Sequence, residues 1–219
     1  MTNEQRKRAS IYTGGTLGEW ALPPEGADDF FIGADRGALF LVEHGIAPDL
    51  AVGDFDSIEP GQLGLVKAAA RETLAFDAVD KDWTDTELAL REAIGRGFHD
   101  IVLYGGLGTR FDHSLANVHL LELADASGCR ATLADAHNEI RLLTGPAVCA
   151  LEADPRYPYV SLLPLSPAAS GITLRGFAYP LTDAALRIGM SLGVSNQLSA
   201  RAGEIELREG KLLVIRSRD

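Results

Sequence analysis

Two aspartates separated by a single residue follow a short apolar run early in the chain. Asp54 and Asp56 belong to the sequence AVGDFDSI, in which Gly53 directly precedes the pair. Mg²⁺ prefers oxygen ligands, and proteins commonly hold it through one or two carboxylates together with substrate phosphates. Aspartate and serine are also ordinary turn residues. The spacing alone therefore fits either a cation site or a solvated turn.

A second polar segment, KDWTDTE, lies further along the chain. Thr84 followed by Glu87 has the spacing of a capping box, which predicts that a helix begins at this point. Asp82 and Asp85 would then lie on the same side of the helix start, with Lys81 beside them. Phosphate oxygens can meet a lysine and free helix amides together, although the helix dipole alone would also explain Asp85. The segment therefore fits a phosphate site or a plain helix start.

The glycine-rich sequence GGLGTRFDH is a third segment whose side chains can do chemistry. It lacks the Gly-Lys-Ser/Thr ending of a Walker loop, and GGTLG near the N-terminus is likewise no dinucleotide fingerprint. Arg110 can pair bidentately with a phosphate or form a surface ion pair. Asp112 is predicted to cap the next helix, on which His113 and Asn117 lie one turn apart. Taken singly, these residues fit a structural role as well as a binding role.

The elements that must position these residues alternate between short apolar runs and longer segments of helical period. Such alternation predicts a parallel sheet with helical crossovers, whose ligands collect outside the carboxyl ends of the strands. The expected strands cover residues 10–13, 29–35, 49–54, 72–76, 100–106 and 130–135. The expected helices cover residues 36–45, 61–72, 84–97 and 112–128. Four segments follow expected strands and would together line one edge of this sheet, namely GADRG (33–37), GDFDS (53–57), DKDWTD (80–85) and GGLGTRFDH (105–113).

After Gly145 the pattern changes to strand-like runs separated by turns rich in proline, glycine and aspartate, which predicts an all-β module. The expected strands cover residues 147–153, 159–166, 171–181, 203–210 and 211–219. A short helix is expected near residues 182–188, and Gly210 between two strand-like runs indicates a hairpin. The chain is thus predicted to combine an α/β domain over residues 1–146 with an all-β domain over residues 147–219.

The overall composition narrows the class of partner. The chain has 219 residues and a formal net charge of -11, which argues against a nucleic-acid backbone or an anionic membrane surface as main partner. Its two cysteines have neither the number nor the spacing of a disulfide framework or a zinc site. No apolar run approaches the roughly 18 residues that a membrane helix needs, and the polar N-terminus does not resemble a signal peptide. A cytoplasmic protein without membrane or nucleic-acid partners is therefore expected.

Taken in order, these segments resemble the bacterial type of thiamine pyrophosphokinase. The resemblance runs from Ala34 to the C-terminus through GADRGALFLVEHGIAPDLAVGDFDSI, DKDWTDTELAL, GGLGTRFDHSLANVHLL, GFAYPL and SLGVSNQ. It implies transfer of a pyrophosphoryl group from ATP to the hydroxyl of thiamine, giving thiamine diphosphate and AMP with Mg²⁺ as cofactor. It also implies an α/β domain that binds ATP and Mg²⁺, a C-terminal β-sandwich domain that binds thiamine, and a homodimer with shared active sites.

The resemblance assigns roles to residues of the first domain. The magnesium ligands would be Asp54, Asp56 and Asp85. Lys81 and Arg110 would join these acids in catalysis. The other residues around ATP would be Asp35, Asp82, Thr84, Asp112, His113 and Asn117.

In the second domain the resemblance places thiamine against Ser195 and Asn196, both of which can donate and accept hydrogen bonds. Without the resemblance, a turn would explain this pair equally well. The chain departs from the family at two positions, because Thr109 stands where a glycine is frequent and Gln197 stands where an acid is common. The first departure narrows the approach of a phosphate to the backbone, and the second removes a charge that would favour the cationic thiazolium.

Three other functions are compatible with the same residues. A related pyrophosphokinase would act on another alcohol, such as a hydroxymethylpterin, although SLGVSNQ favours thiamine. An aspartyl phosphatase would use Asp54 as its nucleophile, because VGDFDSI resembles a strand-end Asp-x-Asp motif. A magnesium-nucleotide binding module would use the same acids without catalysis. Release of AMP that depends on thiamine separates the main hypothesis from all three.

Overall fold

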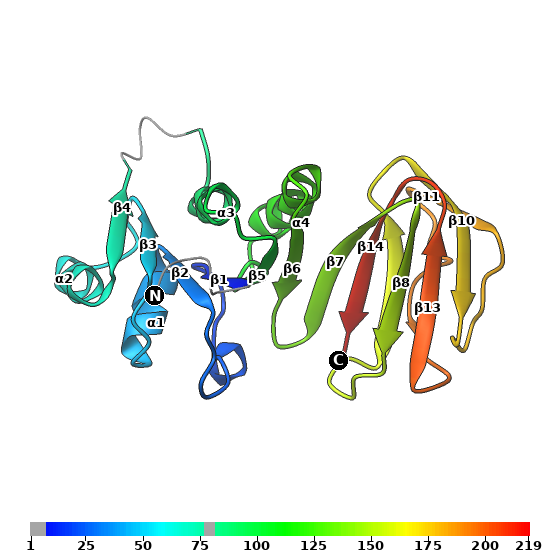
Figure 1. Cartoon of the computed structure of the whole chain (residues 1–219), viewed down its shortest axis with the longest axis horizontal. Coiled ribbons are helices and arrows are strands. Elements are labelled where there is room, and N and C mark those ends of the chain that lie inside the picture. The colour runs from blue at the N-terminus through cyan, green and yellow to red at the C-terminus, as the bar shows by residue number, and fades with distance from the viewer. Residues whose placement is uncertain (1–7, 77–81) are drawn as a thin grey trace. The chain divides into compact units, whose positions relative to one another are not determined.

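The chain folds into two units, of which the first ends at Ala136 and the second begins at His137 (Figure 1). The computed structural model describes residues 8–76 and 82–219. Within these residues every α-helix belongs to the first unit, and the second unit is built from strands. The change of pattern seen in the sequence is therefore a change of architecture.

The division between the units comes earlier than the expected boundary after residue 146. Strand β7 (Asn138–Thr144) causes the difference, because each of its residues pairs with a residue of β14 (Lys211–Ser217). These residues were not predicted as a strand. Since their partner lies at the far end of the chain, local pattern could not assign them to the second unit.

A parallel sheet forms the centre of the first unit, in the order β6-β5-β1-β2-β3-β4 (Figure 1). Its strands are β1 (Arg8–Tyr12), β2 (Phe30–Ala34), β3 (Leu50–Gly53), β4 (Glu72–Ala75), β5 (Asp100–Tyr104) and β6 (Arg130–Ala134). All six lie where the sequence predicts strands. The strand order reverses at β1, which pairs with β2 on one side and with β5 on the other.

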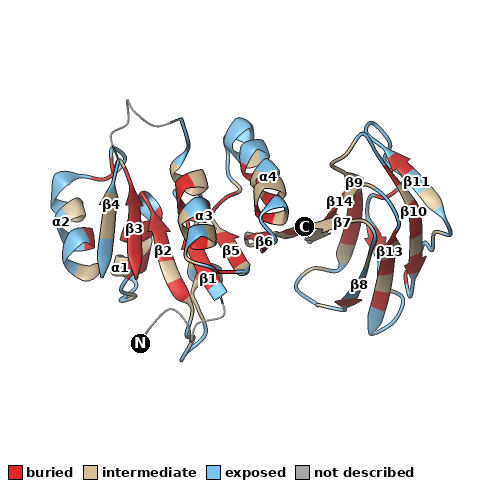
Figure 2. Cartoon of the chain, turned by 45° about the horizontal axis from the view of Figure 1, so that its top comes forward, coloured by how far each residue is buried: buried red, intermediate tan, exposed pale blue. Residues whose placement is uncertain are grey.

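Four α-helices connect these strands at the positions that the helical period predicts. They are α1 (Arg36–Glu43), α2 (Pro60–Ala69), α3 (Asp85–Gly95) and α4 (Phe111–Ala126). Helix α1 contacts α2, and α3 contacts α4. Buried residues concentrate on the central strands, as Figure 2 shows, so this packing fixes the strand ends in place. Among the described residues no helix has the length and apolar character needed to cross a membrane.

Two antiparallel groups of strands form the second unit, in the orders β12-β9-β14-β7 and β11-β10-β13-β8. Besides β7 and β14 the strands are β8 (Ala147–Glu152), β9 (Tyr159–Pro164), β10 (Ala168–Arg175), β11 (Ala184–Arg187), β12 (Asn196–Gln197) and β13 (Ala202–Leu207). Leu151, Leu162, Ile172, Ile205 and Val214 belong to one buried cluster. Both groups of strands thus share a single core, which makes the unit a β-sandwich.

Two local predictions for the second unit are wrong. The short helix expected near residues 182–188 is the strand β11, in which Leu186 alone is buried between exposed neighbours and which pairs with β10. Gly210 does not close a hairpin, because β13 pairs with β8 and β10 whereas β14 pairs with β7 and β9. A link between the two layers of a sandwich has the same strand-turn-strand pattern as a hairpin, so the sequence cannot separate them.

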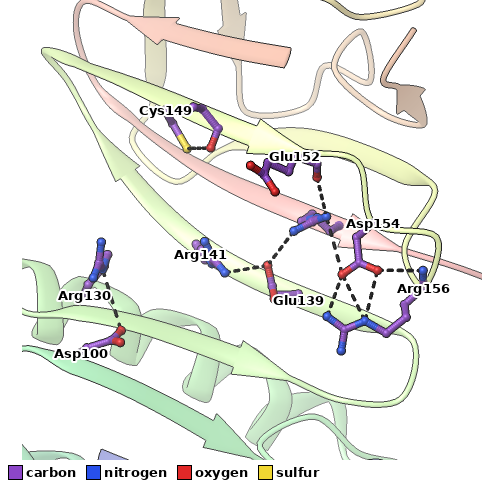
Figure 3. A network of polar contacts seen from close by, with 10 residues as sticks. Asp100, Arg130, Glu139, Arg141, Cys149, Glu152, Asp154 and Arg156 are labelled. Atoms are coloured by element: carbon purple, nitrogen blue, oxygen red, sulfur yellow. Dashed lines mark hydrogen bonds and ion pairs between the residues drawn. The ribbon is translucent and has the colours of Figure 1, made fainter. Parts of the chain in front are cut away.

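A cluster of charged side chains ties the strands of the second unit together (Figure 3). The side chain of Arg216 on β14 is only 12% exposed and lies 3.5 Å from Glu139. It also donates a hydrogen bond to the carbonyl oxygen of Glu152 at 2.9 Å. Asp154 lies 3.8 Å from Arg216 and pairs with Arg156 at 2.7 Å. Removal of one partner would leave a largely buried charge without compensation, so this cluster has a structural role.

Candidate active site

A cavity of about 320 Å³ opens at the carboxyl edge of the sheet in the first unit. Its walls come from the segments that follow β1, β2 and β5 and from the first turns of α3 and α4. Because β1 lies between β2 and β5, the cavity is placed where the strand order reverses. Open α/β sheets bind their ligands at this position.

Three aspartates lie together at this edge. Asp35, Asp54 and Asp56 each offer a carboxylate oxygen, and these oxygens lie within 4.8 Å of one another. Asp35 follows β2 and the other two follow β3, so the pairing of these parallel strands brings them together. The N–H of Asp35 donates to the carbonyl of Val52 at 2.9 Å, which fixes one strand end to the next. The sequence predicts both segments at one edge of the sheet, and the structure brings Asp35 next to Asp54 and Asp56.

The residue between the paired acids determines where they point. Phe55 has a φ of 58°, in the left-handed region, and only 4% of it is exposed. Its ring belongs to an apolar cluster with Ala38 and Val66. A bulky residue in this conformation is strained, so the surrounding packing must hold it there. With the ring held in the core, the flanking carboxylates stay at the edge of the sheet.

Asp35 has an unusual electrostatic environment, since only 9% of the residue is exposed. Burial raises the pKa of its carboxyl, a hydrogen bond from Ser57 opposes this rise, and the charges of Asp85, Asp54 and Asp56 add to it. Its Oδ1 atom is buried and has no hydrogen-bond partner among the described residues. Buried polar atoms are normally paired, and an oxygen beside two further carboxylates fits a divalent cation as its partner.

Asp85 lies next to these three acids. The family resemblance implies that Asp85 is the third metal ligand, and the group of three neighbouring carboxylates in the structure consists of Asp35, Asp54 and Asp56. Asp85 lines the cavity, and a Cβ atom built on Gly53 would lie 3.3 Å from its Oδ1. Its charge also acts on Asp35. We call the four carboxylates of Asp35, Asp54, Asp56 and Asp85 the acidic edge.

Helix α3 begins where the capping signal predicts. Thr84 is its N-cap, and the Oγ1 atom accepts a hydrogen bond from the N–H of Glu87 at 3.2 Å. Asp85 in the first turn complements the helix dipole. Asp82 is exposed and does not line the cavity in the described part of the chain. Lys81 lies outside the described residues.

Helix α4 begins one residue before Asp112, so this aspartate lies in the first turn and is not the predicted cap. Its carboxylate pairs with Arg110 at 2.6 Å, and this hydrogen bond holds the pKa of Asp112 below its usual range. Arg110 and His113 both line the cavity. The Nδ2 of Asn117 donates to the carbonyl of Gly106 at 2.7 Å, so this buried amide supports the loop after β5.

Sequence reasoning missed several residues of the cavity wall. Gly14 and Gly15 follow β1, and a Cβ atom on Gly15 would lie 2.0 Å from the carbonyl oxygen of Gly105. Only glycine permits the two loops to come this close. Arg36 at the start of α1 and Ser57 after β3 also line the cavity. The two adjacent glycines of GGTLG could have indicated the segment after β1, whereas no pattern in the sequence indicated Arg36.

Ser195 and Asn196 lie in the second unit, where Asn196 supports a neighbouring segment. Its Oδ1 accepts hydrogen bonds from the N–H groups of Tyr179 at 3.0 Å and Gln197 at 2.9 Å. Its Nδ2 donates to the carbonyl of Tyr179 at 2.8 Å. Ser195 is exposed, has a φ of 60°, and donates its N–H to Ser161 Oγ at 3.0 Å. The buried side chain of Asn196 therefore supports the backbone at Tyr179 and Gln197, whereas Ser195 is exposed to solvent.

Comparison with known families covers both units. Residues 26–133 match the family described as thiamin pyrophosphokinase, catalytic domain, and residues 149–212 match thiamin pyrophosphokinase, vitamin B1 binding domain. The chain belongs to the thiamine pyrophosphokinase family. The predicted function and its class, an ATP-dependent diphosphotransferase, are thereby confirmed. Nothing in the comparisons supports a related kinase that acts on a hydroxymethylpterin.

Thiamine pyrophosphokinases of known sequence and structure extend the match over nearly the whole chain. The enzyme of Bacillus subtilis (strain 168) is 35% identical over 189 residues, which are 86% of this chain and 87% of that protein. A crystal structure of the Bacillus subtilis enzyme covers 97% of this chain and 100% of its own, with a TM-score of 0.87 and 32% identity. A thiamin pyrophosphokinase family protein from Enterococcus faecalis gives a TM-score of 0.88 at 32% identity, with 97% and 99% of the two chains covered.

Proposed function

We propose that the acidic edge holds Mg²⁺ and the phosphates of ATP, and that a pyrophosphoryl group passes from ATP to the hydroxyl of thiamine, leaving AMP. The group of Asp35, Asp54 and Asp56, with carboxylate oxygens within 4.8 Å of one another, carries this proposal. One of these acids has a buried oxygen without a hydrogen-bond partner among the described residues. A donor set made only of carboxylate oxygens favours a hard divalent cation, and kinase sites commonly hold Mg²⁺ in this way.

The three acids would hold the metal, with Asp85 beside them. When bound, Mg²⁺ supplies positive charge that offsets the negative charge of the phosphate oxygens. The chain carries a formal net charge of -11, and its acidic edge on its own repels a polyphosphate. Binding of ATP at this edge is therefore expected to depend on the metal.

Cationic side chains and loop amides would contact the phosphates from the other walls. The side chain of Arg110 is 69% exposed and pairs with Asp112. An exposed ion pair of this kind stabilises the fold little, so Arg110 can turn to a phosphate at small cost. We assign Lys81 the same role on the strength of the family resemblance. The family resemblance also places Asp35, Asp82, Thr84, Asp112, His113 and Asn117 around ATP, and of these Asp35, Thr84, His113 and Asn117 line the cavity at the acidic edge.

The thiamine hydroxyl would attack the β-phosphorus in line, with AMP as the leaving group. Positioning of the two substrates and electrostatic stabilisation of the transferred group would supply the rate, without a covalent enzyme intermediate. The fixed acids and the loop after β5 suit this role, because Phe55 and Asn117 hold them through buried contacts. Preorganised groups of this kind need no rearrangement when charge develops.

We also propose that the second unit binds thiamine and forms a homodimer with shared active sites. Residues 149–212 match a vitamin B1 binding domain. Ile188, Met190, Leu192 and Val194 are exposed apolar residues within one short segment of this unit. Exposed apolar side chains that gather in this way are typical of an interaction surface.

Both cysteines are free thiols, which accords with a cytoplasmic location.

An assay of AMP release with ATP, Mg²⁺ and thiamine tests the proposed reaction. AMP should form only when thiamine and the metal are both present, and thiamine diphosphate should form in equal amount. Folded protein that binds ATP but forms no thiamine-dependent AMP would refute the proposal and favour a binding module. A phosphorylated Asp54 trapped during turnover would instead favour an aspartyl phosphatase.

A further inference from the structure

A second cavity of about 400 Å³ adjoins the first and has no role in the reaction as described so far. The residues that line both cavities are Thr13, Gly14, Gly15, Arg36, Gly108 and Thr109. Because these residues are shared, a ligand in the first cavity can extend into the second. We call the second cavity the α1 cavity, because a face of that helix forms one of its walls.

Four residues of α1 line this wall, namely Arg36, Leu39, Phe40 and Glu43. Their spacing of three, four and seven residues places them in one stripe along the helix. Leu17 adds a further apolar side chain from the segment after β1. The stripe therefore has a cation at its start, an apolar middle and an anion at its end.

The length of this stripe matches a nucleoside. Arg36 and Glu43 are seven residues apart, which corresponds to about 10 Å along a helix axis. This distance is comparable with that from the 5′-phosphate of a nucleotide to the far edge of its base. Arg36 lines both cavities and so lies where the phosphate chain would pass from one to the other. Glu43 lines only the α1 cavity, at the end that a base would reach.

The walls between the two charged residues suit a planar base. Leu39 is buried, and the ring of Phe40 contacts those of Tyr12 and His44, with centroids 5.9 Å and 4.3 Å apart. A flat aromatic ligand can bury its faces against such side chains. Glu43 is the last residue of α1, where the helix dipole disfavours a negative charge. Within the described part of the chain it has no hydrogen-bond or ion-pair partner, so its carboxylate is available to a ligand.

We propose that the α1 cavity receives the nucleoside of the ATP and that Glu43 selects a base with an amino group at its edge. The proposal rests on the proposed function, because that function places the phosphates at the acidic edge. An ionised carboxylate accepts hydrogen bonds and cannot donate them. A carboxylate aligned with position 6 of the purine accepts from the amino group of adenine but meets the carbonyl oxygen of hypoxanthine, whose N1–H donor lies at the next position. Glu43 is thus a specificity residue for the nucleotide, and Arg36 contacts the phosphate nearest the ribose.

Calorimetric binding of AMP and IMP to the whole purified chain tests this proposal without thiamine or turnover. The wild-type chain should bind AMP about tenfold tighter than IMP, as expected for one hydrogen bond to a charged group. Glu43→Gln should bring the two affinities within about threefold of each other, because a glutamine amide can turn to accept from AMP or donate to IMP. Glu25→Gln removes the same charge at an exposed residue that lines neither cavity, and it should keep the wild-type preference.

A second variant tests the orientation of the nucleotide. Arg36→Gln should weaken AMP and IMP by the same factor and leave adenosine binding unchanged, because only the phosphate is lost as a partner. An unchanged AMP preference in Glu43→Gln, or an equal loss of preference in Glu25→Gln, would overturn the proposal. Intact discrimination in a chain that releases no thiamine-dependent AMP would support the α1 cavity and refute the proposed reaction, so the two failures are distinguishable.

Discussion

Replacement of Asp56 by asparagine should stabilise the metal-free protein. The carboxylates of Asp35 and Asp54 have oxygens within 4.8 Å of that of Asp56. Two like charges at this separation repel by about 1 kcal/mol in water and by several times more at an effective dielectric constant of 20. The lower figure applies, because Asp56 is exposed. Asp56→Asn should therefore raise the free energy of unfolding by about 1 kcal/mol, or the melting temperature by about 2–4 °C.

Saturation with Mg²⁺ should make the wild-type chain more stable than Asp56→Asn. A ligand at a hundred times its dissociation constant stabilises the folded state by about 2.7 kcal/mol. The wild-type chain should gain this amount, whereas Asp56→Asn, with one carboxylate fewer at the acidic edge, should gain little. The variant would then melt above the wild type in chelator and below it in saturating Mg²⁺. Its thiamine-dependent AMP release should fall by about a hundredfold or more.

Thermal melts in EDTA and across a Mg²⁺ titration provide the measurement. Glu25→Gln is the matched control, since it removes one exposed negative charge away from the acidic edge and should follow the wild type in both conditions. A variant that keeps the full Mg²⁺-induced shift would show that Asp56 does not bind the metal. A loss of stability in EDTA would show that its carboxylate supports the fold, which contradicts the repulsion inferred here.

Three further variants probe the supports of the site and the fold. Glu72→Gln should lower the free energy of unfolding at pH 7 by at most about 1 kcal/mol. The hydrogen bond from Arg96 holds the pKa of Glu72 below its usual 4.5. The difference in unfolding free energy between variant and wild type should therefore disappear in urea melts as the pH falls below that value. A difference that stays constant with pH would exclude the ion pair as its cause. Gly53→Ala should lower both the melting temperature and the release of AMP. The φ of Gly53 is 149°, and the new Cβ atom would lie 3.3 Å from Asp85 Oδ1. Wild-type values for both measurements would show that the strand end adapts. Asn196→Ala should cost about 1–3 kcal/mol in urea unfolding, and an effect on thiamine affinity alone would make it a contact residue.

The first unit could largely be predicted because its signals are local. Each strand is a short apolar run, and each helix shows its own period. Two residues, Thr84 and Glu87, predict the start of α3, and the structure contains the hydrogen bond that their spacing predicts. Asp54 and Asp56 could likewise be placed at the edge, because a strand end follows from the run before them.

What the sequence could not supply depends on distant parts of the chain. Residues 184–187 became a strand because β10 offers a partner, and local propensity has no access to that pairing. The segment with Asp35 could be predicted at this edge, but the closeness of its carboxylate to Asp54 and Asp56 depends on the pairing of β2 with β3. Phe55 carried no signal in the sequence, yet its buried ring belongs to the apolar cluster beneath the turn. In each case the deciding interaction is tertiary.

The reversal of strand order at β1 also sets a minimum length of chain that can form the two cavities. Strand β1 is translated before β5, and Tyr12 pairs with Tyr104, so one edge of β1 has no partner strand until β5 is translated. Until then, a bare strand edge is open to wrong partners such as another nascent chain. Thr13 and Gly108 line both cavities, so a truncated product that ends before β5 cannot assemble either one. Binding of a nucleotide therefore requires a chain that extends through β5 and into α4.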